Sequence, residues 1–138
     1  MKKIFIDTTA WDAIEDSGDA NHEAAMIFKD EIANRYELIT SNYILDETYT
    51  LLLINIGYER TVAFHRQLEM LIKAGVLQVI QLSENIIEKA WNIFEKYNQD
   101  KCWSFTDCTS YAAMKELDID EVFSFDRHFE QMGLIRKP

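Results

Sequence analysis

The chain has 138 residues, of which 48% are hydrophobic, enough for about one domain with its own core. Its formal net charge of −10 argues against binding nucleic acid through bulk electrostatics, because that mode draws on clustered Lys and Arg. Any contact with nucleic acid must therefore be local, while the acidity suits either a basic protein partner or a plain solvated surface.

Cellular location is indicated by the segments that the chain lacks. No stretch reaches the roughly 20 consecutive apolar residues of a membrane span, and the N-terminus lacks the longer apolar region of a secretory signal. The two cysteines, Cys102 and Cys108, have neither zinc-finger spacing nor the density of a disulfide scaffold. We expect a cytoplasmic protein with reduced thiols.

Strand-like and helix-like segments alternate along the chain, without a repeat or a linker. Apolar runs predict strands at residues 3–7, 38–39, 76–80 and 121–125 and an edge segment at 134–135. Helical spacing and capping residues predict helices just after Thr8-Thr9, at 20–34, from Ser41 or Asn42 to about 56 with a left-handed cap at Gly57, at 59–73, 83–97, 105–117, and a short turn from His128. This alternation predicts an α/β fold with a parallel sheet and helices on both faces.

Four carboxylates stand at positions that an α/β sheet would bring together. Asp7 closes the first strand, Asp126 closes the 121–125 run, Glu47 lies in the helix after the second strand, and Asp107 lies near the start of the helix before the last well-defined strand. The carboxyl edge of a parallel sheet is where such residues converge. None of the four has an obvious basic neighbour in the sequence.

Carboxylates placed that close together repel one another unless a divalent cation neutralises them. Ligation by Asp and Glu oxygens, without histidine or thiolate, favours Mg²⁺ or Mn²⁺ over zinc. The first interpretation is therefore metal-assisted phosphodiester chemistry.

The segments around these acids resemble the motifs of PIN-domain ribonucleases in order and spacing over nearly the whole chain. The matching segments are Ile-Phe-Ile-Asp-Thr at 4–8, Thr-Ser-Asn-Tyr-Ile-Leu-Asp-Glu-Thr at 40–48, Ser-Phe-Thr-Asp-Cys-Thr-Ser at 104–110 and Phe-Ser-Phe-Asp-Arg-His-Phe at 123–129. Together with the ending at 132–134, they are similar in particular to the toxin subunits of VapBC toxin–antitoxin systems.

The resemblance implies one PIN domain over residues 1–138, a three-layer α/β/α sandwich whose parallel sheet has four or five strands. It also implies Mg²⁺ or Mn²⁺ in an acidic pocket, endonucleolytic cutting of RNA, a homodimer and a complex with a cognate antitoxin protein. Asp7 is then the central metal ligand, with Asp107 and Asp126 completing the direct or water-mediated metal shell. Glu47 belongs to the same metal-binding and catalytic set and positions metal-bound water.

Thr8 and Ser124 adjoin the acids and are predicted either to support them by hydrogen bonds or to cap a strand end or turn. Asp46 competes with Glu47, but neighbours on a helix point in different directions, and the family pattern selects Glu47. His128 is considered as a general base and interpreted instead as a helix-start or surface histidine.

Four other side chains near the acids have two interpretations each. Trp103 and Tyr111 flank Asp107 and would either stack on bases or, more simply, form core. Arg127 and Lys101 would either touch RNA phosphate or be ordinary surface charges.

Three rival functions fit the sequence less well. A phosphatase of the haloacid dehalogenase type needs a second acid two residues after Asp7, where Thr9 stands. A phosphoacceptor receiver domain needs paired acids at the first strand end and a late lysine, and neither is evident. A non-enzymatic PIN-like module for protein binding is disfavoured because all four acids are present.

Overall fold

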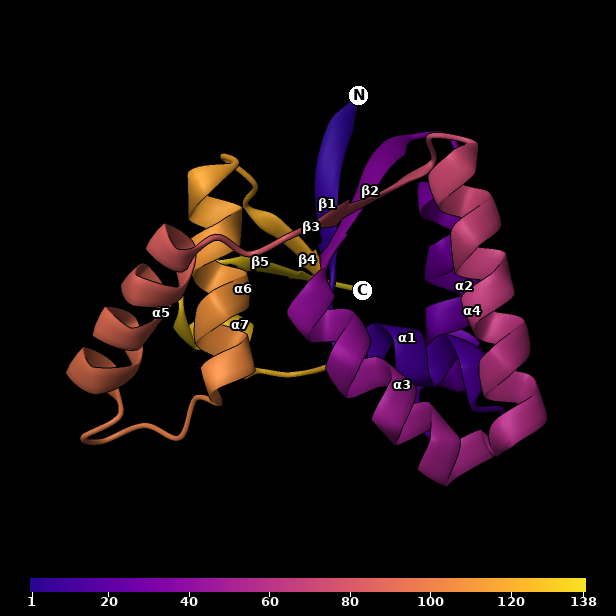
Figure 1. The fold of residues 1–138 in the computed structure, drawn as a ribbon, viewed down its shortest axis with the longest axis horizontal. Coiled ribbons are helices and arrows are strands. Elements are labelled where there is room, and N and C mark those ends of the chain that lie inside the picture. The colour runs from indigo at the N-terminus through magenta and orange to yellow at the C-terminus, as the bar shows by residue number, and fades with distance from the viewer.

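The computed structural model describes residues 1–138 as a five-stranded sheet in the order β3-β2-β1-β4-β5 (Figure 1). The strands are β1 Lys2–Ile6, β2 Tyr36–Ser41, β3 Leu77–Ile80, β4 Glu121–Phe123 and β5 Ile135–Lys137. Every pairing is parallel, with Ile4 opposite Leu38 and Phe5 opposite Val122. The predicted parallel sheet of four or five strands is confirmed, with five.

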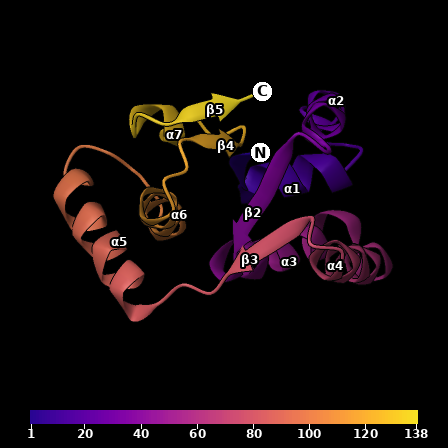
Figure 2. The same cartoon turned by 90° about the horizontal axis from the view of Figure 1, so that it is seen from above.

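Seven helices connect the strands: α1 Thr8–Glu15, α2 His22–Ile32, α3 Asn42–Ile56, α4 Tyr58–Lys73, α5 Glu84–Tyr97, α6 Phe105–Glu116 and α7 His128–Gln131. Helices α1 to α4 gather on one side of the strands, and α5 and α6 lie on the other (Figures 1 and 2). The predicted α/β sandwich is therefore confirmed. None of these helices has both the length and the apolarity that crossing a membrane requires.

The central strand β1 is apolar because helices cover both faces of the sheet. Ile4, Phe5 and Ile6 are at most 2% exposed and belong to the main core, to which both the sheet and the α1–α4 side contribute. A smaller core lies between α5 and α6 and includes Ala90 and Ala112. The residues that follow β1 are therefore anchored by a strand that is buried on both faces.

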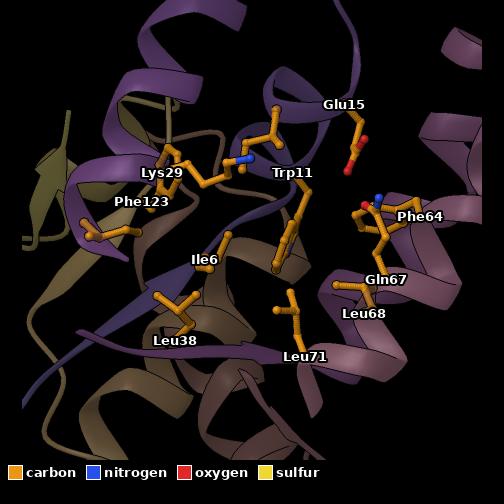
Figure 3. Close-up of a pocket in the computed structure, with 12 residues that line it drawn as sticks. Ile6, Trp11, Glu15, Lys29, Leu38, Phe64, Gln67, Leu68, Leu71 and Phe123 are labelled. Atoms are coloured by element: carbon orange, nitrogen blue, oxygen red, sulfur yellow. The ribbon is translucent and has the colours of Figure 1, made fainter. Parts of the chain in front are cut away.

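The α1–α4 side encloses an apolar cavity of about 130 Å³ against the sheet, lined by Trp11, Phe64, Phe123 and other mostly hydrophobic residues (Figure 3). Its only charged lining residues are Glu15 and Lys29. None of the four candidate acids reaches it, so this cavity is separate from the predicted site.

Two local predictions need correction. Strand β4 ends at Phe123 rather than at residue 125, because the Phe125 amide leaves the sheet and donates to the Thr9 hydroxyl at 2.9 Å. Asp126 therefore stands in the loop after the strand. Gly57 has φ 87° and ψ 177°, so it is not the predicted left-handed helical cap; it adopts an extended positive-φ conformation that glycine tolerates without a steric penalty.

Candidate active site

Asp7 follows β1 directly and caps the N-terminus of α1. Its Oδ2 accepts hydrogen bonds from the Thr9 hydroxyl at 2.8 Å, the Thr9 amide at 3.3 Å and the Ser124 hydroxyl at 2.8 Å. Its Oδ1 accepts no hydrogen bond. Burial raises the pKa of Asp7 to about 6 and the charge of Asp107 adds to the rise, against the lowering effect of the hydrogen bonds from Thr9 and Ser124.

The support predicted from Thr8 comes instead from Thr9. An N-cap side chain accepts from the second or third helical residue, and Thr9 is the second residue of α1. The Thr8 hydroxyl is buried without a hydrogen-bond partner. Ser124 does make the predicted hydrogen bond to a carboxylate.

Asp107 lies in the first turn of α6 and is only 7% exposed. It forms a capping box with Ser104: the Asp107 amide donates to the Ser104 hydroxyl at 3.0 Å, and the Ser104 amide donates to Asp107 Oδ2 at 3.2 Å. Burial raises the pKa of Asp107, and the negative charge of Asp126 contributes to the rise, while bonding to His128 opposes it. The charge of Asp107 in turn raises the pKa of Asp7, so Asp107 interacts electrostatically with both other aspartates.

Asp126 is fixed by the loop between β4 and α7. Its amide donates to the Ser124 hydroxyl at 3.0 Å, and its Oδ1 accepts the His128 amide at 2.9 Å. Each of the three aspartates accepts hydrogen bonds through only one of its two carboxylate oxygens. The other oxygens, which are Asp7 Oδ1, Asp107 Oδ1 and Asp126 Oδ2, accept no hydrogen bond. Three anchored carboxylates with one open oxygen each fit a hard divalent cation.

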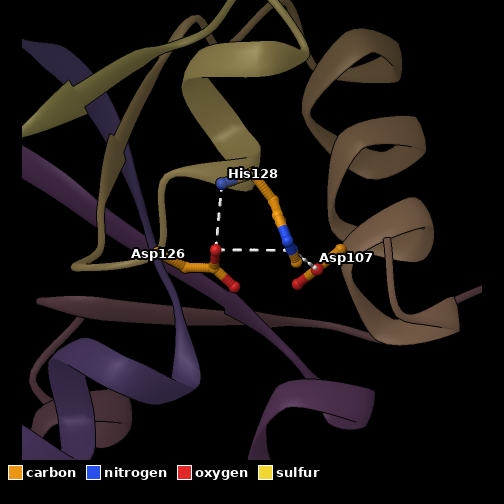
Figure 4. Close-up of side chains that lie close together, drawn as sticks. All are labelled: Asp107, Asp126 and His128. Atoms are coloured by element: carbon orange, nitrogen blue, oxygen red, sulfur yellow. Dashed lines mark hydrogen bonds and ion pairs between the residues drawn. The ribbon is translucent and has the colours of Figure 1, made fainter. Parts of the chain in front are cut away.

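His128, interpreted from the sequence as a helix-start or surface histidine, is the first residue of α7, and its side chain also reaches the aspartates. Its Nδ1 lies 3.0 Å from Asp107 Oδ2 and 3.4 Å from Asp126 Oδ1 (Figure 4). Ligand atoms of the three residues all lie within 4.8 Å of one another. Asp107 and Asp126 therefore have a titratable partner in space that the sequence analysis did not assign to them. The available signal was the two-residue spacing from Asp126, which places His128 at the first residue of α7.

Glu47 is exposed on α3 and makes neither a hydrogen bond nor an ion pair. It lines a surface hollow together with Asp46 and with Thr106, the neighbour of Asp107 in α6. The fold therefore brings Glu47 beside the start of α6, and its side chain forms no hydrogen bond with the aspartates. Asp46 is equally exposed and lines the same hollow, so the preference for Glu47 stays a prediction.

The four flanking side chains considered from the sequence lie in different surroundings. Trp103 is 5% exposed in the core between α5 and α6, and its indole donates to Gln131 at 2.8 Å, so it offers no open face for stacking on bases. Tyr111 is half-buried against the main core. Lys101 lies 3.6 Å from Asp100, whereas Arg127 is exposed and forms no ion pair.

Comparison with known proteins identifies the family. The family model described as PIN domain matches residues 4–134, and the chain belongs to this family. It is 32% identical over 133 residues to the 23S rRNA-specific endonuclease VapC20 of Mycobacterium tuberculosis, covering 96% of this chain and 95% of that protein. It is also 34% identical over 92 residues to a VapC ribonuclease of Archaeoglobus fulgidus, covering 67% of this chain and 55% of that protein.

Solved structures agree with this assignment. The crystal structure of Mycobacterium tuberculosis VapC20, described as a sarcin-ricin loop cleaving toxin, has a TM-score of 0.81 and 31% identity over 96% of this chain and 97% of that chain. FitAcB from Neisseria gonorrhoeae has a TM-score of 0.69 at 15% identity over 98% and 96% of the two chains, which shows a shared fold. The predicted resemblance to VapC-like PIN-domain ribonucleases is confirmed.

Proposed function

We propose that this protein is a divalent-metal-dependent endoribonuclease that cleaves 23S ribosomal RNA within the sarcin-ricin loop. The observation that carries the proposal is a connected set of three aspartates: Asp107 and Asp126 lie close together, the charge of the buried Asp107 acts on the buried Asp7, and the Ser124 hydroxyl links Asp7 to Asp126. The similarity to VapC20 over nearly both whole chains supports the choice of RNA. This substrate would place the protein in the cytoplasm.

The residues have distinct parts in the proposed reaction. Asp7, Asp107 and Asp126 would hold Mg²⁺ or Mn²⁺, with Thr9 and Ser124 fixing the carboxylate of Asp7. The bound ion would lower the pKa of water and offset the charge that develops on the scissile phosphate. Glu47 would enter from the hollow beside Thr106 to orient the attacking water.

The proposed partner is a cognate antitoxin, with this chain as the toxin of a VapBC-type pair and as a homodimer. The VapC names of its relatives support the pairing, and the net charge of −10 suits a partner with basic residues. Arg127, which is exposed and follows Asp126 in the chain, would meet RNA phosphate.

The test incubates purified protein with intact ribosomes and Mn²⁺ and maps cuts by primer extension. We expect one cut within the sarcin-ricin loop, lost with chelator and in Asp7→Asn. The matched control is Asp118→Asn, an exposed acid in the turn after α6, which should cut like the parent. Cleavage by Asp7→Asn at the parental rate would contradict the metal site, and cutting elsewhere in ribosomal RNA would contradict the substrate.

A further inference from the structure

We propose that His128 binds the metal directly through Nδ1, which makes the centre a mixed nitrogen and oxygen site that favours a first-row transition ion such as Mn²⁺ over Mg²⁺. This inference rests on the proposed metal-dependent function and concerns which ion the site selects. An all-carboxylate set, as predicted from the sequence, would carry no such preference for nitrogen-binding ions.

The first support is the direction of the imidazole ring. Its Nδ1, rather than Nε2, faces both Asp107 Oδ2 at 3.0 Å and Asp126 Oδ1 at 3.4 Å (Figure 4). In an octahedral site with metal–ligand distances of about 2.1 Å, neighbouring ligand atoms stand about 3.0 Å apart. The two distances are close to those between neighbouring corners of such a site, in which Asp107 Oδ2 and Asp126 Oδ1 would each use a second lone pair for the ion beside the hydrogen bond that they accept.

The second support is that the fold holds the three side chains independently. Asp107 is held by the capping box of α6, and Asp126 by the Ser124 hydroxyl and the His128 amide. His128 begins α7, whose neighbour Phe129 is fully buried in the main core. A helix, a loop and a second helix thus hold ligand atoms within 4.8 Å of one another through contacts of the fold itself.

The competing interpretation gives His128 only a hydrogen bond from Nδ1 to Asp107. In that case Nδ1 carries a proton and cannot bind metal. Ligation instead requires the proton on Nε2, which makes no hydrogen bond to the protein; the side chain is 33% exposed, so water is available to it. The two interpretations therefore predict different atoms in contact with the ion.

The chemical consequence is ion selection. Mg²⁺ is a hard ion that takes oxygen ligands and keeps several waters. Imidazole suits Fe²⁺, Ni²⁺, Cu²⁺ and Zn²⁺, and Mn²⁺, although it is the weakest binder of that series and also suits carboxylates, is softer than Mg²⁺ and accepts a nitrogen ligand more readily. Replacing one oxygen ligand by Nδ1 should weaken Mg²⁺ relative to Mn²⁺. His128 would thus contribute specificity for the ion while the aspartates supply the charge.

Pulsed electron paramagnetic resonance of the full chain with Mn²⁺ tests this contact directly. We expect nitrogen modulation from a coordinated imidazole in the parent, changed by ¹⁵N-histidine labelling and absent in His128→Gln. The control is His65→Gln, because His65 lies on α4, bonded to Tyr49 and Glu69 instead of the aspartates. Parental protein that binds Mn²⁺ without imidazole modulation would overturn the proposal.

Binding titrations supply the second readout. In His128→Gln we expect Mn²⁺ to bind at least about tenfold more weakly, since even outer-shell partners of metal ligands are worth that much, and Mg²⁺ measured by competition to change far less. Equal losses for both ions would mean that His128 only orients the carboxylates. Failure of the proposed ribonuclease function looks different: metal-loaded parent would leave ribosomal RNA uncut while the imidazole modulation persists. A parent that binds no Mn²⁺ would overturn both.

Discussion

Ser124 couples Asp7 to Asp126, because its hydroxyl donates to Asp7 Oδ2 at 2.8 Å and accepts the Asp126 amide at 3.0 Å. A single buried hydroxyl therefore fixes two candidate metal ligands that follow neighbouring strands, β1 and β4. This arrangement makes Ser124 a positioning residue without contact to substrate.

Ser124→Ala should lower cleavage by about ten- to a hundredfold, the range seen for groups that orient metal ligands. The hydrogen bond from Ser124 lowers the pKa of Asp7, so its loss should also move the acid limb of the pH–rate profile to higher pH. Steady-state cleavage rates across pH measure both effects. The matched control is Thr8→Val, which removes a buried hydroxyl that has no hydrogen-bond partner and should leave the profile in place.

Asp7→Asn should stabilise the metal-free protein at neutral pH. The folded-state pKa of Asp7 is about 6 against 3.8 for a free carboxyl, so the folded state binds the proton more tightly and loses stability as pH rises between these values. The difference between the two pKa values limits the gain in the free energy of unfolding to about 3 kcal/mol. Urea unfolding in chelator should show the mutant more stable at pH 7.5, with the gain vanishing near pH 4. A mutant that is less stable at pH 7.5 would mean that ionised Asp7 is compensated within the fold.

Glu47→Gln should abolish most cleavage, and Asp46→Asn should leave it near the parental rate. Both side chains are exposed on α3 and line the same hollow, so the pair is matched in burial and in charge lost. Cleavage assays with both variants under saturating Mn²⁺ decide between them. The reverse order would make Asp46 the acid that serves the site.

Glu121→Gln should destabilise the protein by about 1–3 kcal/mol without changing metal affinity. Glu121, whose side chain is 4% exposed, bonds Lys137 at 2.6 Å, Lys2 at 3.2 Å and the Tyr36 hydroxyl at 2.9 Å, so it ties together the ends of four strands. Burial alone would raise the pKa of Glu121, but the hydrogen bonds from Lys137, Tyr36 and Lys2 outweigh it and the net pKa is lowered.

A lowered folded-state pKa means that this stability is present above the ordinary value of 4.5 and is lost as pH falls through the folded-state value. The free energies of unfolding of Glu121→Gln and of the parent should therefore become equal at acid pH. The control is Glu116→Gln, which removes an exposed ion pair to Lys89 and should change stability by no more than about 1 kcal/mol. Equal losses of stability in the two variants would show that the hydrogen bonds of Glu121 contribute no more than the exposed Glu116–Lys89 ion pair.

The sequence by itself determined the elements of this protein and the identity of its acids. Apolar runs and serine caps are local signals, because strand burial and helix capping depend on residues only a few positions apart. The caps predicted at Ser41 and Ser83 accept the amides of Ile44 and Ile86 as expected. The position of Asp7 directly after an apolar run likewise placed it at the carboxyl edge.

Only the tertiary structure decided how side chains from distant segments meet. His128 reaches Asp107 across 21 positions, and the hydroxyls of Thr9 and Ser124, 115 positions apart, both donate to the same oxygen of Asp7. These contacts depend on the packing of α7 against α6 and β5 and on the pairing of β1 with β4, which no local pattern encodes. For the same reason the place of Glu47, on a correctly predicted helix and in a hollow beside Thr106, follows from the packing of α3 near α6, and its role with the aspartates stays a prediction.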